Sequence, residues 1–100
     1  MKSTVDCNTI RRILAEHRAE LEKLGVKSLA LFGSAARGEA RPGSDLDFLV
    51  EFEGPASFDK YMYLKFFLED LLGTKVDLVT RKALKPRLRP YIEKEAIDVT

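Results

Sequence analysis

The sequence predicts a two-layer α/β (α+β) domain, in which helices pack on one face of a small mixed sheet of about four strands. Segments with apolar residues at helical spacing alternate along the chain with short apolar runs of strand length. The chain has 100 residues, 45% of them hydrophobic, which is enough for one core. We therefore expect residues 1–100 to form a single domain.

Two long segments have the apolar periodicity of a helix. Residues 8–24 and 57–72 each carry such a pattern, and each is followed by a glycine, where helices commonly end. The basic segment after residue 80 is interrupted by Pro86 and Pro90. Only one or two further helical turns are expected there, at 91–94.

Strands are expected at 28–32, 45–52 and 75–80, with a short fourth strand at 97–99. Because strand side chains alternate, the apolar residues of 45–52 share one face, and the acidic ones share the other. The first face would carry Leu46, Phe48, Val50 and Phe52, and the second Asp45, Asp47, Leu49 and Glu51. Helices would cover the apolar face and leave the acidic face open.

The composition excludes several classes of protein. Lys and Arg total 17 against 16 Asp and Glu, so the surface as a whole is not a nucleic-acid footprint. The single Cys and single His cannot form a disulfide within the chain or a structural zinc site. A reducing, cytoplasmic location is expected. The N-terminus lacks a signal peptide, and no apolar run is long enough to cross a membrane.

Three aspartates break the local pattern of their strands. Asp45 and Asp47 lie about 6.6 Å apart on one strand face, where two carboxylates repel unless a cation lies between them. Asp77 lies between Val76 and Leu78. If its strand neighbours 45–52, the three carboxylates line one patch and suit two Mg²⁺ ions. Taken singly, a D-x-D is usually a solvated strand start, and Asp77 could be an exposed edge residue.

Gly33 and Ser34 follow directly after the first expected strand. A glycine at this position lets the backbone turn sharply and approach a ligand, and a helical turn opening at Ser34 offers free N–H groups and a hydroxyl to phosphate oxygens. Ser34 could instead be only a helix cap. Gly33 and Gly38 have the spacing of the P-loop glycines, but Glu39 stands where that motif needs lysine, so the P-loop is excluded.

The order of these elements is more specific than any one of them. Gly33-Ser34 ends one strand, Asp45-x-Asp47 begins the next, and Asp77 lies on the strand after the following helix. This order resembles the nucleotidyltransferase superfamily that includes DNA polymerase beta. More narrowly, the segment GSAARG at 33–38, Arg41 and the segment SDLD at 44–47 resemble the minimal nucleotidyltransferase (MNT) family. The resemblance covers nearly the whole chain.

The resemblance implies a fold, a reaction and residue roles. Gly33 and Ser34 would hold the β- and γ-phosphates of ATP, and Asp45 and Asp47 would bind two Mg²⁺ ions. Asp77 would bind one of these ions and help to deprotonate the acceptor hydroxyl. The reaction would transfer AMP from ATP and release pyrophosphate.

Arg37, Arg41 and Ser44 are less specific candidates for the same site. One of the two arginines would reach the triphosphate, or both would pair with loop carboxylates or Asp45 and hold the shape of the loop. Ser44 is grouped with the nucleotide-binding residues, although it is expected to shape the turn before Asp45 more than to contact the nucleotide.

The resemblance also implies a partner. MNT proteins typically pair with a HEPN-domain ribonuclease toxin, and some attach AMP to a tyrosine of that toxin. This chain would then be the antitoxin of a type VII-like pair, as a homodimer or a hetero-oligomer with the toxin, and its acceptor would be gripped by the partner. The alternative is a non-catalytic antitoxin that masks its toxin sterically. The basic segment 81–89 could face solvent, the partner or RNA, although nucleic acid is not the expected partner.

Overall fold

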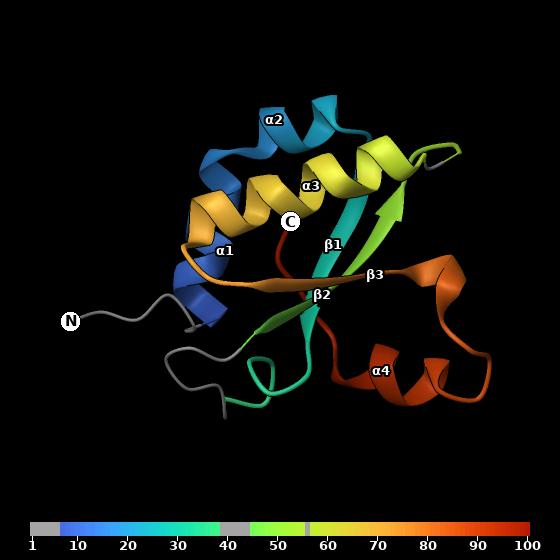
Figure 1. Cartoon of the computed structure of the whole chain (residues 1–100). Helices are drawn as coiled ribbons and strands as arrows, with labels where there is room; N and C mark the ends of the chain where they lie inside the picture. The colour runs from blue at the N-terminus through green and yellow to red at the C-terminus, as the bar shows by residue number, and fades with distance from the viewer. Residues whose placement is uncertain (1–6, 39–44, 56) are drawn as a thin grey trace.

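The computed structural model describes residues 7–38, 45–55 and 57–100, and they form a four-stranded mixed sheet with helices (Figure 1). The strand order is β3-β2-β1-β4. The elements, in chain order, are α1 (Cys7–Glu16), α2 (Arg18–Lys23), β1 (Val26–Phe32), β2 (Leu46–Phe52), α3 (Phe58–Leu72), β3 (Val76–Thr80), the 3-10 turn η1 (Arg81–Ala83), α4 (Arg89–Glu95) and β4 (Ile97–Asp98). The predicted fold class is confirmed.

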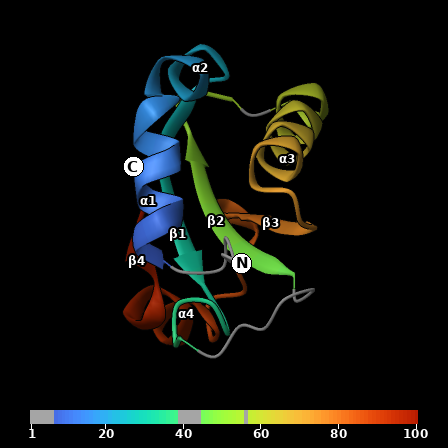
Figure 2. The ribbon, with the colours of Figure 1, turned by 90° about the vertical axis from the view of Figure 1, so that its left-hand side faces the viewer.

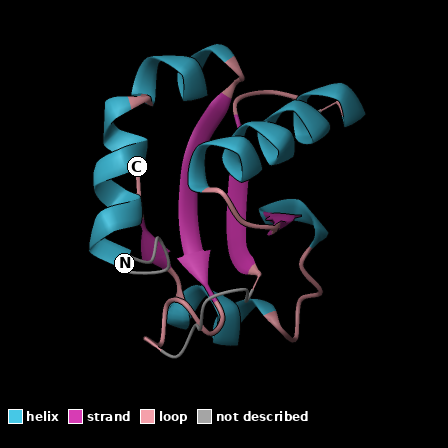
Figure 3. Cartoon of the chain, turned by 60° about the vertical axis from the view of Figure 1, so that its left-hand side comes forward, coloured by secondary structure: helices cyan, strands magenta, loops and turns pink. Residues whose placement is uncertain are grey.

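The sheet contains one parallel pair of strands. β1 runs antiparallel to both β2 and β4, whereas β2 and β3 are parallel and are connected by α3. A parallel pair requires a crossover connection, and α3 supplies it by packing over the sheet (Figure 3). The starts of β2 and β3 therefore lie side by side at one end of the sheet.

Helices α1, α2 and α3 cover one face of the sheet, as expected. Their buried residues form one cluster with the apolar faces of the strands. In this cluster the fully buried members of β2 are Leu46, Phe48 and Val50, and those of α3 include Leu64 and Leu68. The alternation predicted for β2 is therefore correct.

The opposite face of the sheet is only partly open. Ala30 and Leu49 on this face pack against Leu84, and Ile92 and Ala96 pack on the same cluster. The segment after β3 thus folds back under the sheet and covers the middle of the face that was expected to be polar. Figure 2 shows α4 at the end of the molecule opposite α2, close to the end of β1.

The first helical segment differs from the prediction, since the expected helix 8–24 is two helices that meet at His17. The backbone N–H of His17 donates to Leu14 at 3.0 Å, which tightens the chain at this point, and its Nδ1 lies 3.0 Å from the Ile13 carbonyl oxygen. The imidazole packs edge-on against Phe67 of α3, with 6.0 Å between the ring centres. His17 thus contacts α3 at the point where the two helices meet, a tertiary contact that helical periodicity does not register.

The last helix is longer than predicted. α4 begins at Arg89, and Pro90 lies in its first turn, where a proline costs no hydrogen bond because the N–H groups there have no helical partner. The prolines therefore position the start of this helix instead of ending it. Among the described residues, no helix is both long and apolar enough to cross a membrane.

The α3 helix begins with a side-chain cap that offers a test of the fold. Ser57 Oγ accepts a hydrogen bond from the backbone N–H of Lys60 at 3.1 Å. Replacing Ser57 with Ala should lower the free energy of unfolding by about 1 kcal/mol, and urea denaturation measures the loss. The substitution Ser57→Asp, which keeps an acceptor, should retain most of the stability. Equal losses in both variants would contradict this role of the cap.

Candidate active site

The three candidate carboxylates lie at one end of the sheet. The parallel register of β2 and β3 pairs Asp47 with Asp77, so their side chains project from the same face of neighbouring strands about 4.8 Å apart. Asp45 stands immediately before β2, two residues from Asp47, and is exposed. The sequence analysis required the strands that carry Asp47 and Asp77 to be neighbours, and β2 and β3 are neighbours.

The α3 helix fixes the start of β3 and thereby Asp77. Lys65 donates to the Val76 carbonyl oxygen at 2.7 Å and to Glu69 Oε2 at 3.0 Å, and Glu69 in turn accepts from the Val76 N–H at 3.0 Å. The Val76 N–H and then the Lys65 ammonium hold the pKa of Glu69 below its ordinary value. These contacts set the register in which Asp77 lies next to Asp47.

Gly33 brings the backbone at the end of β1 directly against Asp47. Its φ is +75°, in the left-handed region that glycine adopts without strain. A Cβ at this position would lie 2.1 Å from Asp47 Oδ2 and 3.0 Å from Asp47 Cγ. Only glycine can therefore occupy this position while Asp47 keeps its present orientation.

The residues after Gly33 form a hydrogen-bonded turn, at the place where the sequence analysis considered a helical turn opening at Ser34. The Arg37 N–H donates to the Gly33 carbonyl oxygen and the Gly38 N–H to that of Ala35, both at 3.2 Å. Within the described residues, the N–H groups of Ser34, Ala35 and Ala36 have no hydrogen-bond partner. Unpaired N–H groups that open such a turn, together with the Ser34 hydroxyl, can bind phosphate oxygens.

The sequence analysis did not identify Glu95, the fourth carboxylate at this end of the sheet. Glu95 is the last residue of α4, and its ion pair with Arg37 places it beside the turn that follows Gly33. Glu95 Oε2 accepts a hydrogen bond from Arg37 Nη1. Of the two roles considered for Arg37, ion pairing is observed here, with a carboxylate from α4.

The carboxylates at this end are electrostatically coupled. Burial raises the pKa of Asp47 most, and the neighbouring charges of Asp77 and Asp45 raise it further. The Arg37 guanidinium opposes this rise, and Glu95 adds to it. A group of carboxylates that repel each other in this way attracts a cation, because a bound cation relieves the repulsion.

The described carboxylates alone do not form a complete ligand set for a metal ion, since no three of the described acidic, His or Cys side chains are arranged to hold one. Mg²⁺ commonly binds through one or two carboxylates and takes its other ligands from water and substrate phosphates. The Asp47–Asp77 pair beside the Gly33 turn fits this requirement, with carboxylates on one side and free N–H groups for phosphate on the other.

The raised pKa of Asp47 predicts how stability depends on pH in the metal-free chain. Above the ordinary pKa of an aspartate, the folded state retains the Asp47 proton that the unfolded state has lost, so the free energy of unfolding falls as pH rises through the raised pKa. Urea denaturation from pH 3 to 7 should show this contribution as a difference between the wild-type chain and Asp47→Asn. Parallel pH profiles for the two proteins would contradict it.

Two of the candidate residues lie outside the described part of the chain. Ser44 and Arg41 both fall within residues 39–44, so their predicted roles remain predictions. The residues that the structure brings together are Gly33, Ser34 and Arg37 at the end of β1, and the aspartates at the starts of β2 and β3.

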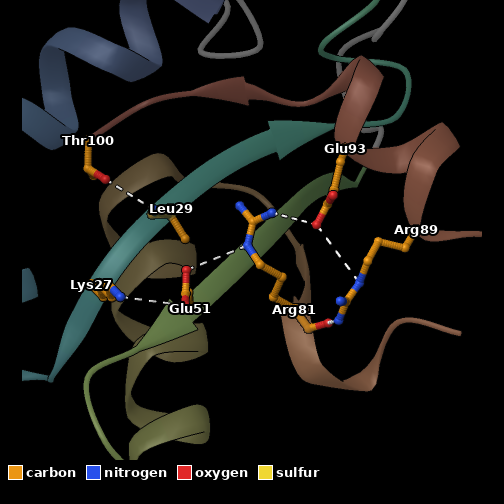
Figure 4. A network of polar contacts seen from close by, with 7 residues as sticks. All are labelled: Lys27, Leu29, Glu51, Arg81, Arg89, Glu93 and Thr100. Atoms are coloured by element: carbon orange, nitrogen blue, oxygen red, sulfur yellow. Dashed lines mark hydrogen bonds and ion pairs between the residues drawn. The ribbon is translucent and has the colours of Figure 1, made fainter. Parts of the chain in front are cut away.

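The basic segment 81–89 lies away from this site, and its two ends are paired within the chain (Figure 4). Arg81 Nη1 donates to Glu93 Oε2 at 2.8 Å, and Arg81 Nε lies 3.7 Å from Glu51. Arg89 Nη2 donates to the Arg81 carbonyl oxygen at 2.8 Å. The network holds α4 against the far end of β2, so Arg81 and Arg89 have a structural role.

Comparison with known proteins places this geometry in context. Residues 11–99 match the nucleotidyltransferase domain family. The protein adenylyltransferase MntA of Thermococcus cleftensis is 43% identical over 91 residues, which cover 90% of this chain and 92% of that protein.

Solved structures share the fold. The structure of a proposed minimal nucleotidyltransferase superposes with a TM-score of 0.80 at 42% identity, over 92% of this chain and 94% of that one. A chain from the complex of the tri-AMPylated HEPN toxin of Shewanella oneidensis with its MNT antitoxin gives a TM-score of 0.65 at 17% identity, over 91% and 71% of the two chains. The resemblance predicted from the sequence is confirmed.

Proposed function

This chain belongs to the nucleotidyltransferase domain family, and on that premise we propose that it transfers AMP from ATP to a tyrosine of a HEPN-family ribonuclease toxin, as the antitoxin of a type VII-like pair. The observation that carries this proposal is the contact between three elements. Asp47 of β2 lies beside Asp77 of β3, and its carboxylate packs directly against the Gly33 backbone at the end of β1.

Two Mg²⁺ ions would be held by Asp45, Asp47 and Asp77 together with the phosphates of ATP. Bound there, the metal supplies positive charge that neutralises the phosphates and lowers the pKa of the acceptor hydroxyl. The charges of Asp77 and Asp45, which after burial raise the pKa of Asp47, support this fit because a bound cation would offset them. ATP would bind with its β- and γ-phosphates on Ser34 and the N–H groups of the turn that follows Gly33.

The chain's own residues then position the reaction. Asp77 is exposed at the edge of the patch and accepts the proton of the acceptor hydroxyl as that oxygen bonds to the α-phosphorus. The bond from the α-phosphorus to the oxygen that bridges to the β-phosphate breaks, and pyrophosphate leaves on the Ser34 side. No covalent intermediate on the protein is needed, because positioning and charge neutralisation supply the rate enhancement.

The relatives support a protein acceptor. The T. cleftensis relative is named a protein adenylyltransferase and matches this chain over nearly its full length. The helices and strands of the described residues all belong to one sheet and the helices packed on it, and none of them forms a separate acceptor-binding domain.

Incubation with ATP labelled at the α-phosphate, Mg²⁺ and the product of the neighbouring gene, which the proposal expects to be a HEPN protein, tests the proposal. Label should appear on the HEPN protein and be lost when the acceptor tyrosine is replaced with phenylalanine. ATP labelled at the γ-phosphate should leave the protein unlabelled. A stable complex of the two proteins that takes up no α-label would overturn the proposal.

A second candidate function is steric masking of the toxin without catalysis. The observation that favours it is an exposed aromatic pair, Tyr63 and Phe66, on the opposite side of the sheet from the aspartates. The double substitution Asp45→Asn with Asp47→Asn discriminates between the two functions. Toxin neutralisation in cells should be lost if catalysis is required, and it should survive if binding alone suffices.

A further inference from the structure

The outward side of α3 carries a row of four exposed residues with aromatic side chains in the middle and acidic ones at the ends. Asp59, Tyr63, Phe66 and Asp70 are spaced at i, i+4, i+7 and i+11, so they lie along one line on the helix surface. Tyr63 is 67% exposed and Phe66 57%. These four residues are called the α3 ridge below.

The aromatic pair of the α3 ridge is not needed to hold α3 on the sheet. The opposite side of the helix already buries Leu64, Leu68 and Leu72 in the core. A surface helix that is apolar on both sides commonly has a partner for its second side. The ridge therefore has the character of an interaction surface.

A shallow cavity of about 510 Å³ adjoins the ridge. It is lined by Tyr63, Phe66, Phe67, Glu69 and Asp70. Phe67 makes the edge-on contact with the His17 ring and packs partly against the core. The hollow is open to solvent and combines three aromatic rings with the carboxylates of Glu69 and Asp70, so it suits an apolar side chain that lies beside a basic one.

The negative charges of the ridge indicate which charges a partner helix would carry. Asp59 and Asp70 form no ion pair with any described residue, and they lie eleven positions apart, which is about 16 Å along a helix. A complementary helix would carry apolar side chains at its centre and Lys or Arg about three turns apart. Cations near Tyr63 and Phe66 would also gain from the aromatic rings.

A second copy of this chain is a poor occupant. In an antiparallel pairing of two α3 ridges, Tyr63 of one copy would meet Phe66 of the other, but Asp59 would face Asp70 at both ends. In a parallel pairing each aspartate would face its own equivalent. Like charges placed opposite each other are destabilising, so the ridge disfavours self-association.

We propose that the α3 ridge docks a helix of the protein acceptor, with apolar residues at its centre and basic residues at both ends. The proposal rests on the proposed function for the existence of a protein partner. The ridge lies on the helix-covered side of the sheet, whereas Asp47 and Asp77 project from the other side. The chain can therefore grip its partner without covering the nucleotide site.

Binding of the HEPN protein, measured by titration calorimetry, tests the ridge. Tyr63→Ser with Phe66→Ser should weaken binding by about 30-fold, as loss of a buried aromatic anchor does. Asp59→Lys with Asp70→Lys should weaken it by about 10-fold, and wild-type affinity should fall with added salt. The matched control is Tyr91→Ser on α4, since Tyr91 is 74% exposed but lies off the ridge, and it should change the affinity less than 3-fold.

Several outcomes would overturn the ridge proposal. One is a Tyr63→Ser, Phe66→Ser variant whose affinity for the HEPN protein stays within 3-fold of wild type. Another is a loss of affinity in Tyr91→Ser as large as the loss in that variant. A wild-type dimer in light scattering that dissociates in the ridge variant would assign the surface to self-association. A wild-type chain that does not bind the HEPN protein would also overturn it.

The experiments test the proposed function and the α3 ridge independently of each other. Binding through the ridge without label transfer would reject the function and keep the surface. Label transfer with unchanged binding in the ridge variant would keep the function and reject the surface. If both hold, the ridge variant should recover the wild-type transfer rate at saturating concentrations of the HEPN protein, because only the affinity has changed.

Discussion

Replacing Asp47 with Asn is expected to slow transfer of AMP to the partner by about 1,000-fold, which corresponds to about 4 kcal/mol of transition-state stabilisation. The substitution keeps the shape of the side chain and removes the charge that lies between Asp77 and the Gly33 turn. Single-turnover assays with α-labelled ATP measure the rate. The melting temperature should not fall, because the raised pKa of Asp47 shows that its charge is unfavourable in the folded chain.

The matched control for this prediction is Glu51→Gln. Glu51 lies on the same strand four residues further on, on the same side of the sheet, and pairs with Lys27 and Arg81 away from the site. Its removal should leave the transfer rate within about 2-fold of wild type, since its ion pairs with Lys27 and Arg81 lie away from Asp47 and the Gly33 turn. Equal losses in the two variants would show that the effect of Asp47→Asn is not specific to the site.

Replacing Gly33 with Ala should remove activity and also destabilise the fold by about 3 kcal/mol. About 1–2 kcal/mol comes from placing a non-glycine residue at a φ of +75°, and the remainder comes from the clash of the new Cβ with Asp47. Because the new methyl group would also crowd Asp47 Cγ, the whole carboxylate would have to leave its position. Chemical denaturation and the transfer assay measure the two effects.

Gly38 provides the control that separates backbone strain from the clash. It has the same φ of +75°, but a Cβ built there meets nothing within 4 Å. Gly38→Ala should therefore show only the backbone cost. The additional loss in Gly33→Ala should disappear when Asp47 is also changed to Ala, and a loss that persists in this double variant would show that the clash is not its cause.

Most of the fold could be predicted because its elements have strong local signals. The alternation of β2 and the apolar stripe of α3 each identified the element and its buried side. The break at His17 was not predicted, because the apolar periodicity continues through it, and the contact of His17 with Phe67 joins residues 50 positions apart in the sequence. The cover on the second sheet face also depends on tertiary packing, through Leu84 and Ile92.

The candidate site could be predicted in part. Asp45 and Asp47 stand out locally because they interrupt an apolar pattern, and Asp77 does so for the same reason. Their proximity depends on the parallel pairing of β2 with β3, which a crossover helix makes probable but local sequence does not specify. Glu95 gave no local signal, since it lies at the end of α4 and only the tertiary fold brings it to Arg37 and Asp47.

Anomalous diffraction from crystals grown with Mn²⁺ and a non-hydrolysable ATP analogue tests the central claim most directly, that the three aspartates and the Gly33 turn form one metal–nucleotide site. The predicted result is Mn²⁺ density between Asp45, Asp47 and Asp77, with the β- and γ-phosphates on the N–H groups after Gly33. Manganese bound elsewhere, or a triphosphate that does not touch the Gly33–Gly38 turn, would contradict the account.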